Sequence, residues 1–145
     1  MTTIKIRKAT REDLETIRTL LLSSKLPVGD IPAHLPNFLV AEVNGTIAGT
    51  IGIEIYEQTG LLRSASVLPT LQNQGIGTKL FNRLLDDAKE KGVKEILLLT
   101  TTAQNYFAKK GFTPVSRETI TGDVLSSEEF KGGCPSTAIC MRIKL

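Results

Sequence analysis

A glycine-containing segment in the middle of the chain carries the clearest chemical signal in the sequence. Residues Gln72 to Gly77, QNQGIG, follow an apolar stretch that ends at Pro69 and precede a segment with helical periodicity. A strand that feeds a glycine turn at a helix N-terminus presents backbone N–H groups to an anion, and the helix dipole adds positive potential there. The segment from Gln72 to Thr78 is therefore predicted to bind a phosphate-bearing ligand; the alternative is an ordinary tight turn.

Two common phosphate loops do not fit this spacing. A nucleotide P-loop needs a glycine five residues before its Gly-Lys pair, whereas here Thr78 separates Gly77 from Lys79 and the position five before Gly77 is Gln72. The dinucleotide-binding fingerprint needs a third glycine three residues after the second, and that position is Leu80. Both loops are therefore excluded.

The pattern that remains, Val-x-Pro followed by Gln-x-x-Gly-x-Gly, resembles the acetyl-CoA-binding segment of the GNAT N-acetyltransferases. A second signature, Ala103-x-x-x-Phe107-x-x-x-Gly111-Phe112, is similar to the helix and Gly-Phe pair of that family. In the family the loop N–H groups hold the CoA pyrophosphate, so the resemblance implies acetyl-CoA as cofactor and N-acetyltransferase activity. It assigns cofactor binding to Val67, Leu68, Gln72, Asn73, Gln74, Gly75, Ile76, Gly77, Thr78 and Phe107.

The resemblance also implies a route for the acetyl group from the thioester to an amine. A backbone N–H in the segment 67–68 would stabilise the oxyanion, and in the family a tyrosine four residues before the Gly-Phe pair commonly protonates the thiolate. That position is Phe107 here, which has no proton to give and is expected to line the channel for the thiol. Tyr106 is adjacent but turned by about 100° on the helix, so it is a candidate for the catalytic acid and equally for a surface aromatic residue.

Glu54 is the candidate general base, because it lies mid-strand on a face that is otherwise apolar or small, where a carboxylate is unusual. Arg63, in the neighbouring strand LLRSASV, suits a carboxylate or another anionic group of the acceptor. The alternatives are a paired or edge-exposed glutamate at position 54 and a structural salt bridge from Arg63, with Glu54 itself as one partner.

Two further positions are candidates for binding the acceptor. His34, the single histidine, lies in a proline-rich loop that borders the acceptor site in the family. Its alternative is a solvated loop histidine. Ser136, in the run Cys134-Pro135-Ser136 before the last strand, would line the same site, and the alternative there is a small buried thiol in a turn.

A narrower resemblance concerns the acceptor. The segments LLRSASVLP, LLLTTTAQNYFAKKGF and EEFKGGCPSTAICMRIKL are similar to small arsenic-resistance N-acetyltransferases, which are similar in turn to the acetyltransferase domain of N-acetylglutamate synthase. This resemblance implies a small amino-acid-like amine, or an aminated arsenical, as acceptor. A non-catalytic acyl-CoA sensor, which the missing tyrosine leaves open, and a protein or peptide N-acetyltransferase are the alternatives.

Composition bounds the remaining function classes. The 145 residues suffice for one domain, expected to span 1–145, and 41% hydrophobic with 23% charged residues is typical of a globular protein. The net charge of +3 comes without a Lys/Arg run, so no nucleic-acid surface is predicted. Without an apolar stretch of membrane-spanning length or a signal peptide, we expect no membrane partner and a cytoplasmic protein. Two cysteines and one histidine cannot complete a four-ligand zinc site. Many members of the family that the sequence resembles are homodimers, and the sequence leaves a homodimer open.

Hydrophobic periodicity predicts the elements that would position these residues. Strands are expected at 3–8, 38–43, 47–56, 61–68, 95–100, 112–116 and 136–144, with helices at 11–24, 77–91 and 102–110. A loop or short helix is expected within 26–37, and an irregular stretch at 121–133 with a short helix around 127–130. Asn44-Gly45 predicts a tight hairpin, and Gly92 predicts the end of the helix after the glycine turn. The predicted fold class is α/β, a single mixed, mostly antiparallel sheet with helices on both faces.

Overall fold

The computed structural model describes residues 3–26, 28–72, 74–133 and 138–145. Within these ranges seven strands hydrogen-bond into one mixed sheet in the order β1-β2-β3-β4-β5-β7-β6, which confirms the predicted α/β fold class. The strands are β1 (Ile4–Lys8), β2 (Phe38–Val43), β3 (Thr46–Tyr56), β4 (Thr59–Val67), β5 (Glu95–Thr100), β6 (Thr113–Val115) and β7 (Ile139–Lys144). The helices are α1 (Leu14–Ser23), α2 (Ile31–His34), α3 (Ile76–Glu90) and α4 (Gln104–Lys109).

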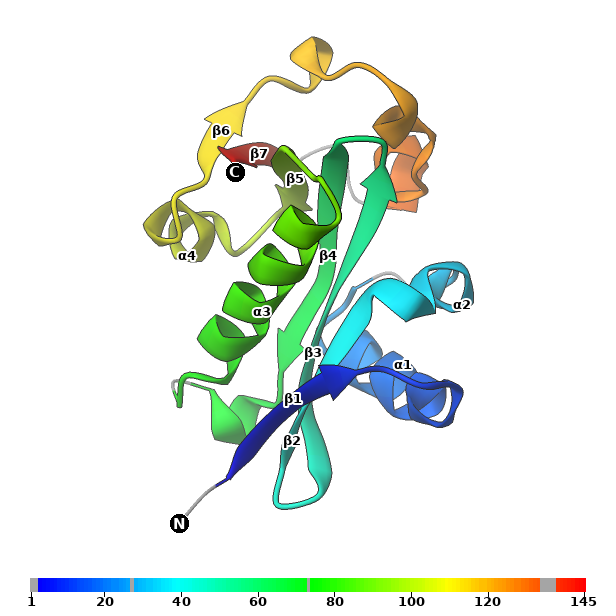
Figure 1. Ribbon diagram of the computed structural model, residues 1–145, viewed down its shortest axis with the longest axis vertical. Coiled ribbons are helices and arrows are strands. Elements are labelled where there is room, and N and C mark those ends of the chain that lie inside the picture. The colour runs from blue at the N-terminus through cyan, green and yellow to red at the C-terminus, as the bar shows by residue number, and fades with distance from the viewer. Residues whose placement is uncertain (1–2, 27, 73, 134–137) are drawn as a thin grey trace. The chain divides into compact units, whose positions relative to one another are not determined.

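The chain forms two compact units, which we describe separately. The first unit comprises Met1–Ile53 and Ser64–Asp87, and the second comprises Glu54–Arg63 and Ala88–Leu145. Strands β3 and β4 and helix α3 each contribute residues to both units. Figure 1 labels these three elements. None of the helices in the described ranges combines the length and the apolar character that a bilayer crossing requires.

The N-terminal helix is shorter than predicted because its first turn, Arg11–Asp13, is a 3-10 turn and α1 begins only at Leu14. The Asp13 side chain organises this turn. Its Oδ2 accepts hydrogen bonds from the Thr10 N–H at 2.7 Å and the Thr10 hydroxyl at 3.1 Å, and it also accepts from Arg7 Nη1 at 2.7 Å. Thr10 therefore marks the start of the helical segment, as the sequence predicts, while Asp13 supplies the carboxylate that holds it.

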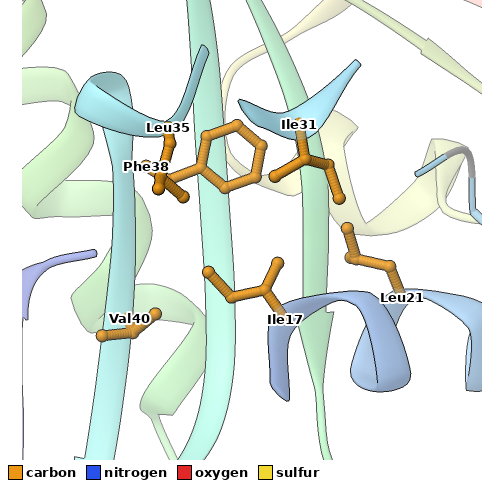
Figure 2. Close-up of a cluster of buried hydrophobic side chains, with 6 residues drawn as sticks. All are labelled: Ile17, Leu21, Ile31, Leu35, Phe38 and Val40. Carbon is orange, nitrogen blue, oxygen red and sulfur yellow. The ribbon is translucent and has the colours of Figure 1, made fainter. Parts of the chain in front are cut away.

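In the first unit one face of β2 packs against the N-terminal helices. The buried cluster on this face consists of Ile17, Leu21, Ile31, Leu35, Phe38 and Val40 (Figure 2). Phe38 and Val40 share the face because side chains alternate along a strand. A Cβ at Gly52, which pairs with Phe38 on the neighbouring strand, would lie 2.5 Å from the Phe38 ring. The glycine therefore gives this ring its space.

The opposite face of the same strands lies against the start of α3. Ala41 pairs with Gly49 of β3, and both project to the side opposite Phe38 and Val40. A Cβ at Gly49 would lie 3.3 Å from Cγ2 of Ile76, the first residue of α3. Helices on both faces of the sheet, as predicted, are therefore present in the first unit.

The hairpin between β2 and β3 turns at Asn44 and Gly45, as the sequence predicts. Their φ angles are 53° and 82°, so both central residues adopt the left-handed conformation that a type I′ turn requires. Val43 and Thr46 pair on either side of the turn. This sets the register at the turn, and a shift of one residue between Glu42 and Ala41 then brings Gly49 opposite Ala41.

In the second unit β5 is the central strand. It runs parallel to β4, with Thr59–Leu61 opposite Glu95–Leu97, and antiparallel to β7, which in turn pairs with β6. The core of this unit is the buried cluster Leu61, Leu97, Ile120, Val124 and Cys140. The apolar run EILLLT is therefore the central strand that was predicted, whereas β6 is shorter than the expected 112–116.

The segment before β7 differs from the short helix expected around 127–130. It contains a 3-10 turn at Asp123–Ser126 and a π-helical turn at Glu129–Gly133. The Ser127 hydroxyl accepts a hydrogen bond from the Glu129 N–H at 3.2 Å, and such local side-chain bonds compete with a regular helix. Ser127 therefore lies between the two turns, and its hydroxyl holds the backbone of Glu129 at the start of the second turn.

Candidate active site

The predicted phosphate-binding segment is anchored by hydrogen bonds within the first unit. Leu68, directly after β4, donates its N–H to the Ala48 carbonyl at 2.8 Å, and Leu71 donates to the Leu68 carbonyl at 2.9 Å. The Gln72 side chain then donates from Nε2 to the Val67 carbonyl at 3.1 Å. These bonds fix the path of the chain from the end of β4 to Gln72.

Gly75 makes the turn into the helix. Its φ angle is +84°, a left-handed conformation that glycine adopts without the steric cost paid by other residues. The Lys79 N–H donates to the Gly75 carbonyl at 3.0 Å, and this is the first hydrogen bond of α3. The N–H groups of Ile76 and Gly77 precede it and therefore have no acceptor within the helix. Such N–H groups and the helix dipole favour an anion, and the binding of one at this turn stays a prediction.

The surface over this turn is open to a ligand. A Cβ placed at Gly75 would meet no atom within 4 Å. Gln74 and Gly75 are exposed, and Gly77 and Thr78 are half-buried. A phosphate can therefore approach the backbone directly. Asn73, which the resemblance assigns to the same segment, lies outside the described residues.

Gly49 contributes to this geometry and was not singled out from the sequence. Its Cβ position lies 3.1 Å from the Ser66 carbonyl oxygen as well as 3.3 Å from Ile76 Cγ2, so a side chain there would push β4 and the start of α3 away. A glycine inside a strand pattern is a recognised sign of close backbone approach. The signal was therefore present in the sequence, in the run AGTIG.

Two backbone features of β4 bear on the predicted oxyanion donor. Ser64 has a φ of +59°, which for a residue with a Cβ costs about 1–2 kcal/mol. The Leu68 N–H is engaged by the Ala48 carbonyl. Whether a backbone N–H of the segment 67–68 stabilises an oxyanion stays a prediction.

In the second unit Arg63 lies between two carboxylates. Its Nη1 is 2.8 Å from Glu54 Oε2, and its Nε is 3.4 Å from Glu129 Oε2. The side chains of Arg63 and Glu54 are fully buried, and that of Glu129 is 6% exposed. The salt bridge between Glu54 and Arg63, one of the alternatives for both residues, is therefore present, while the role of Glu54 as a base stays a prediction.

Two neighbours of this pair were not among the candidate site residues. Tyr56, two residues after Glu54 on β3 and so on the same face, donates its hydroxyl to Glu54 Oε1. Glu129 comes from the π-helical turn far along the chain. Nothing in the run SSEEF distinguishes the buried Glu129 from its exposed neighbour Glu128, so the sequence held no signal for that contact.

On α4 the two aromatic residues lie on different sides of the helix. Phe107 is 7% exposed and packs edge-on against Phe112, with ring centroids 5.6 Å apart. Tyr106 is 44% exposed, and its ring contacts Phe107 at 5.2 Å and the Lys110 ammonium at 5.4 Å. The difference follows from the rotation between adjacent helical residues. Whether Tyr106 acts as the acid stays a prediction.

The remaining candidates are His34, Ser136 and the cysteines. His34 ends α2 in the first unit, half-buried, with Nε2 3.7 Å from Asp30 Oδ2. Ser136 and Cys134 lie outside the described residues. Cys140 is buried in the core of the second unit, and burial raises the pKa of its thiol, so it is expected to remain a protonated, unreactive core residue.

Comparison with known proteins places the chain in a family. A model of the acetyltransferase (GNAT) family matches residues 8–112. The chain is 30% identical over 95 residues to an uncharacterised N-acetyltransferase of Chlorobaculum tepidum, which covers 65% of this chain and 61% of that protein. It is 27% identical over 127 residues to the amino-acid acetyltransferase of Ralstonia nicotianae, covering 81% of this chain and 28% of that enzyme. The chain thus spans less than two thirds of each relative.

The fold is similar to that of N-acetylglutamate synthase from Neisseria gonorrhoeae, whose crystal structure is complexed with coenzyme A and N-acetylglutamate. The TM-score is 0.85 at 20% sequence identity, over 99% of this chain and 35% of the synthase chain. This likeness confirms the predicted fold.

Proposed function

Because this chain belongs to the acetyltransferase (GNAT) family, we propose that it is an acetyl-CoA-dependent N-acetyltransferase for a small, amino-acid-like amine. The glycine turn is the observation that supports the proposal most. In this turn Gly75 adopts a left-handed conformation directly before α3, and a Cβ at Gly75 would meet no atom of the described residues within 4 Å. The relatives named amino-acid acetyltransferase and N-acetylglutamate synthase support the choice of acceptor.

In this proposal the CoA pyrophosphate lies against the N–H groups at the start of α3. Binding there depends on the backbone of residues 74–78 and on the helix dipole rather than on a basic side chain. Val67 and Leu68 would flank the pantetheine end of the cofactor, as the family resemblance implies, and Phe107 would line the channel for its thiol.

The proposed reaction forms a C–N bond and breaks a C–S bond. The amine nitrogen attacks the thioester carbon, the oxyanion accepts a hydrogen bond from a backbone N–H of the segment 67–68, and the CoA thiolate leaves and takes up a proton. Most amines are protonated at neutral pH, so a proton must also leave the nucleophile. Glu54 is the proposed base and Tyr106 the proposed acid. A Tyr106→Phe enzyme with unchanged turnover would exclude that role for Tyr106.

Arg63 is the proposed contact for a negatively charged group of the acceptor. A guanidinium binds carboxylates through paired, charge-assisted hydrogen bonds, and the carboxylates of Glu54 and Glu129 that already lie against it support this role. An arsonate presents similar oxygen acceptors, which keeps an aminated arsenical among the candidates. His34 and Ser136 are proposed as further acceptor contacts.

The experiment that tests this proposal is a CoA-release assay with a panel of amines. The panel contains L-glutamate, other α-amino acids, an aminated arsenical and a peptide with a free N-terminus, and mass spectrometry identifies the acetylated product. We expect turnover with at least one amino acid or the arsenical and none with the peptide. Turnover of the peptide alone would replace the small acceptor with a protein one.

A non-catalytic acyl-CoA sensor is the second candidate, because the buried Phe107 occupies the position of the family's usual acid. Tight acetyl-CoA binding without turnover of any amine in the panel would favour it. The cytoplasmic location expected from the sequence stays a prediction, to be tested by cell fractionation, and light scattering decides whether the chain forms the homodimer that the sequence leaves open.

A further inference from the structure

Two basic side chains follow the glycine turn along one face of α3. Lys79 comes four residues after Gly75, and its N–H donates to the Gly75 carbonyl at 3.0 Å. Arg83 comes four residues after Lys79 in the same helix. Residues spaced by four lie above one another on a helix, one turn of about 5.4 Å apart. Lys79 and Arg83 therefore lead away from the glycine turn in steps of one helical turn.

The charge at this end of α3 is opposite to the charge that the helix dipole favours. Acidic side chains stabilise a helix N-terminus and basic ones do not, and α1 follows this rule with Glu15 in its first turn. The first turn of α3 contains no acidic residue, and its fourth residue is Lys79. Lys79 and Arg83 also place like charges at i and i+4, which destabilises a helix. An anion bound beside both cations would offset both costs.

Both cations are open to a ligand. Lys79 is exposed and Arg83 is half-buried. In the part of the chain that the structure describes, Lys79 forms no ion pair, and Arg83 forms one, from its Nε to Asp87 Oδ1 at 3.3 Å. The Nη groups of Arg83 therefore remain for another partner. The Lys79 side chain also leaves the turn uncovered, because a Cβ at Gly75 would meet no described atom within 4 Å.

We propose that Lys79 and Arg83 bind the 3′-phosphate of acetyl-CoA and so select CoA over its 3′-dephospho form. The proposal rests on the proposed function, because it assumes that the CoA pyrophosphate lies against the turn at Gly75. The CoA ribose carries the 3′-phosphate one sugar ring away from the pyrophosphate. Lys79 begins one helical turn from Gly75, and its flexible four-carbon stem carries the ammonium further.

The two kinds of phosphate are then recognised by different groups. The pyrophosphate is bound by backbone N–H groups, whereas the 3′-phosphate is bound by a lysine ammonium and by the paired N–H donors of an arginine. Removal of the two side chains should therefore weaken the binding of acetyl-CoA and leave the binding of a ligand without the 3′-phosphate unchanged. Lys79 and Arg83 are thus specificity-determining residues for the cofactor.

The test measures calorimetric binding of acetyl-CoA and of 3′-dephospho-acetyl-CoA to wild type, to the double variant Lys79→Gln/Arg83→Gln and to Lys89→Gln. Lys89 is an exposed lysine near the other end of α3 and controls for the loss of positive charge. We expect wild type and Lys89→Gln to bind acetyl-CoA about tenfold more tightly than the dephospho form, a difference of about 1.4 kcal/mol. The double variant should bind both ligands with the affinity that wild type has for the dephospho form.

The proposal is overturned if wild type binds both ligands equally, if the double variant keeps the preference, or if Lys89→Gln loses it. If the double variant does not fold, amine-reactive footprinting of wild type replaces it. At equal saturation acetyl-CoA should protect Lys79 from modification, and 3′-dephospho-acetyl-CoA should not. Equal protection of Lys79 by both ligands, or by neither, overturns the proposal.

The same titrations separate this proposal from the proposed function. If both ligands bind wild type equally and an amine is acetylated, only the role of Lys79 and Arg83 fails. If neither ligand binds wild type, the proposed function fails as well.

Discussion

The two candidate binding regions differ in which part of the chain recognises the ligand. At the start of α3 the proposed recognition groups are backbone N–H groups, which follow an exposed Gly75 in a left-handed conformation. Around Arg63 they are charged side chains buried in the second unit. Ligand recognition in the first region would depend little on side-chain identity. In the second region it would depend on the identity of each charged residue.

This difference has energetic consequences. A substitution in a site made of backbone groups leaves few buried charges without a partner. Such a substitution should therefore change ligand binding more than the free energy of unfolding. In a buried ion cluster a substitution affects both ligand binding and folding, because removal of one partner leaves the opposite charge buried without compensation. Each substitution below is therefore chosen to separate stability from binding in one of the regions.

The largest effect on stability is expected from Arg63→Met. It leaves the carboxylates of Glu54 and Glu129 buried without their guanidinium, and breaking such a pair costs about 3–5 kcal/mol. Urea unfolding measures the change. Adding Glu54→Gln and Glu129→Gln to Arg63→Met should restore part of the loss, because no formal charge then remains in the cluster. A loss below about 1 kcal/mol for Arg63→Met would show that the pair behaves as a surface salt bridge.

Gly52→Ala is expected to destabilise the first unit by about 2 kcal/mol through overpacking. Its new Cβ would lie 2.5 Å from the Phe38 ring, and the ring cannot move without disturbing the α1–α2 cluster. Combining it with Phe38→Leu should give a smaller loss than the sum of the two single changes. Additive losses in thermal unfolding would contradict this contact. Acetyl-CoA affinity of the folded fraction should stay unchanged.

Asp13 provides a pH-dependent comparison with the buried cluster. The hydrogen bonds from Arg7 lower the pKa of the Asp13 carboxyl from 3.8 to about 2, against the opposing effect of burial. Because the folded pKa lies below the unfolded one, the stabilisation, about 2 kcal/mol, is present above about pH 5 and lost as the pH falls towards 2. In Asp13→Asn the free energy of unfolding should vary less with pH over this interval. An unchanged pH profile in Asp13→Asn would contradict the shift.

The smallest effect is expected from Gln72→Ala. Its side chain makes an exposed hydrogen bond to the Val67 carbonyl, worth about 0.5–1 kcal/mol. Because the backbone forms the proposed anion site, acetyl-CoA affinity should fall by no more than about threefold, or some 0.7 kcal/mol. A hundredfold loss of acetyl-CoA affinity, measured by calorimetry, would show that side chains and not the backbone recognise the cofactor there.

The two regions also differed in how far the sequence revealed them. The glycine turn could be predicted because its signal is local: Gly75, Gly77 and the following helix lie within one short segment. The hairpin at Asn44-Gly45 and the central strand β5 were predictable for the same reason. The pairing of Glu54 with Arg63 was one of the alternatives that the sequence allowed, because the two residues lie on consecutive strands.

The contact from Glu129 could not be predicted, because it depends on the path of an irregular segment that no periodicity describes. The same holds for the first turn of the N-terminal helix, where the Asp13 side chain replaces regular helical bonding, and for the left-handed Ser64 within β4. In each case tertiary or side-chain contacts override the local pattern.

The most direct test of the central claim, that the turn at Gly75 binds the acetyl-CoA pyrophosphate, is calorimetric binding of acetyl-CoA to wild type, Gly75→Glu and Gly92→Glu. Gly92 is the matched control: its φ of +82° and open surroundings are like those of Gly75, but it ends α3 instead of starting it. We predict binding by wild type and Gly92→Glu and a loss of about a hundredfold or more in Gly75→Glu, since like charges in contact cost several kcal/mol. Equal affinity in all three folded proteins, or no binding by wild type, would contradict the account.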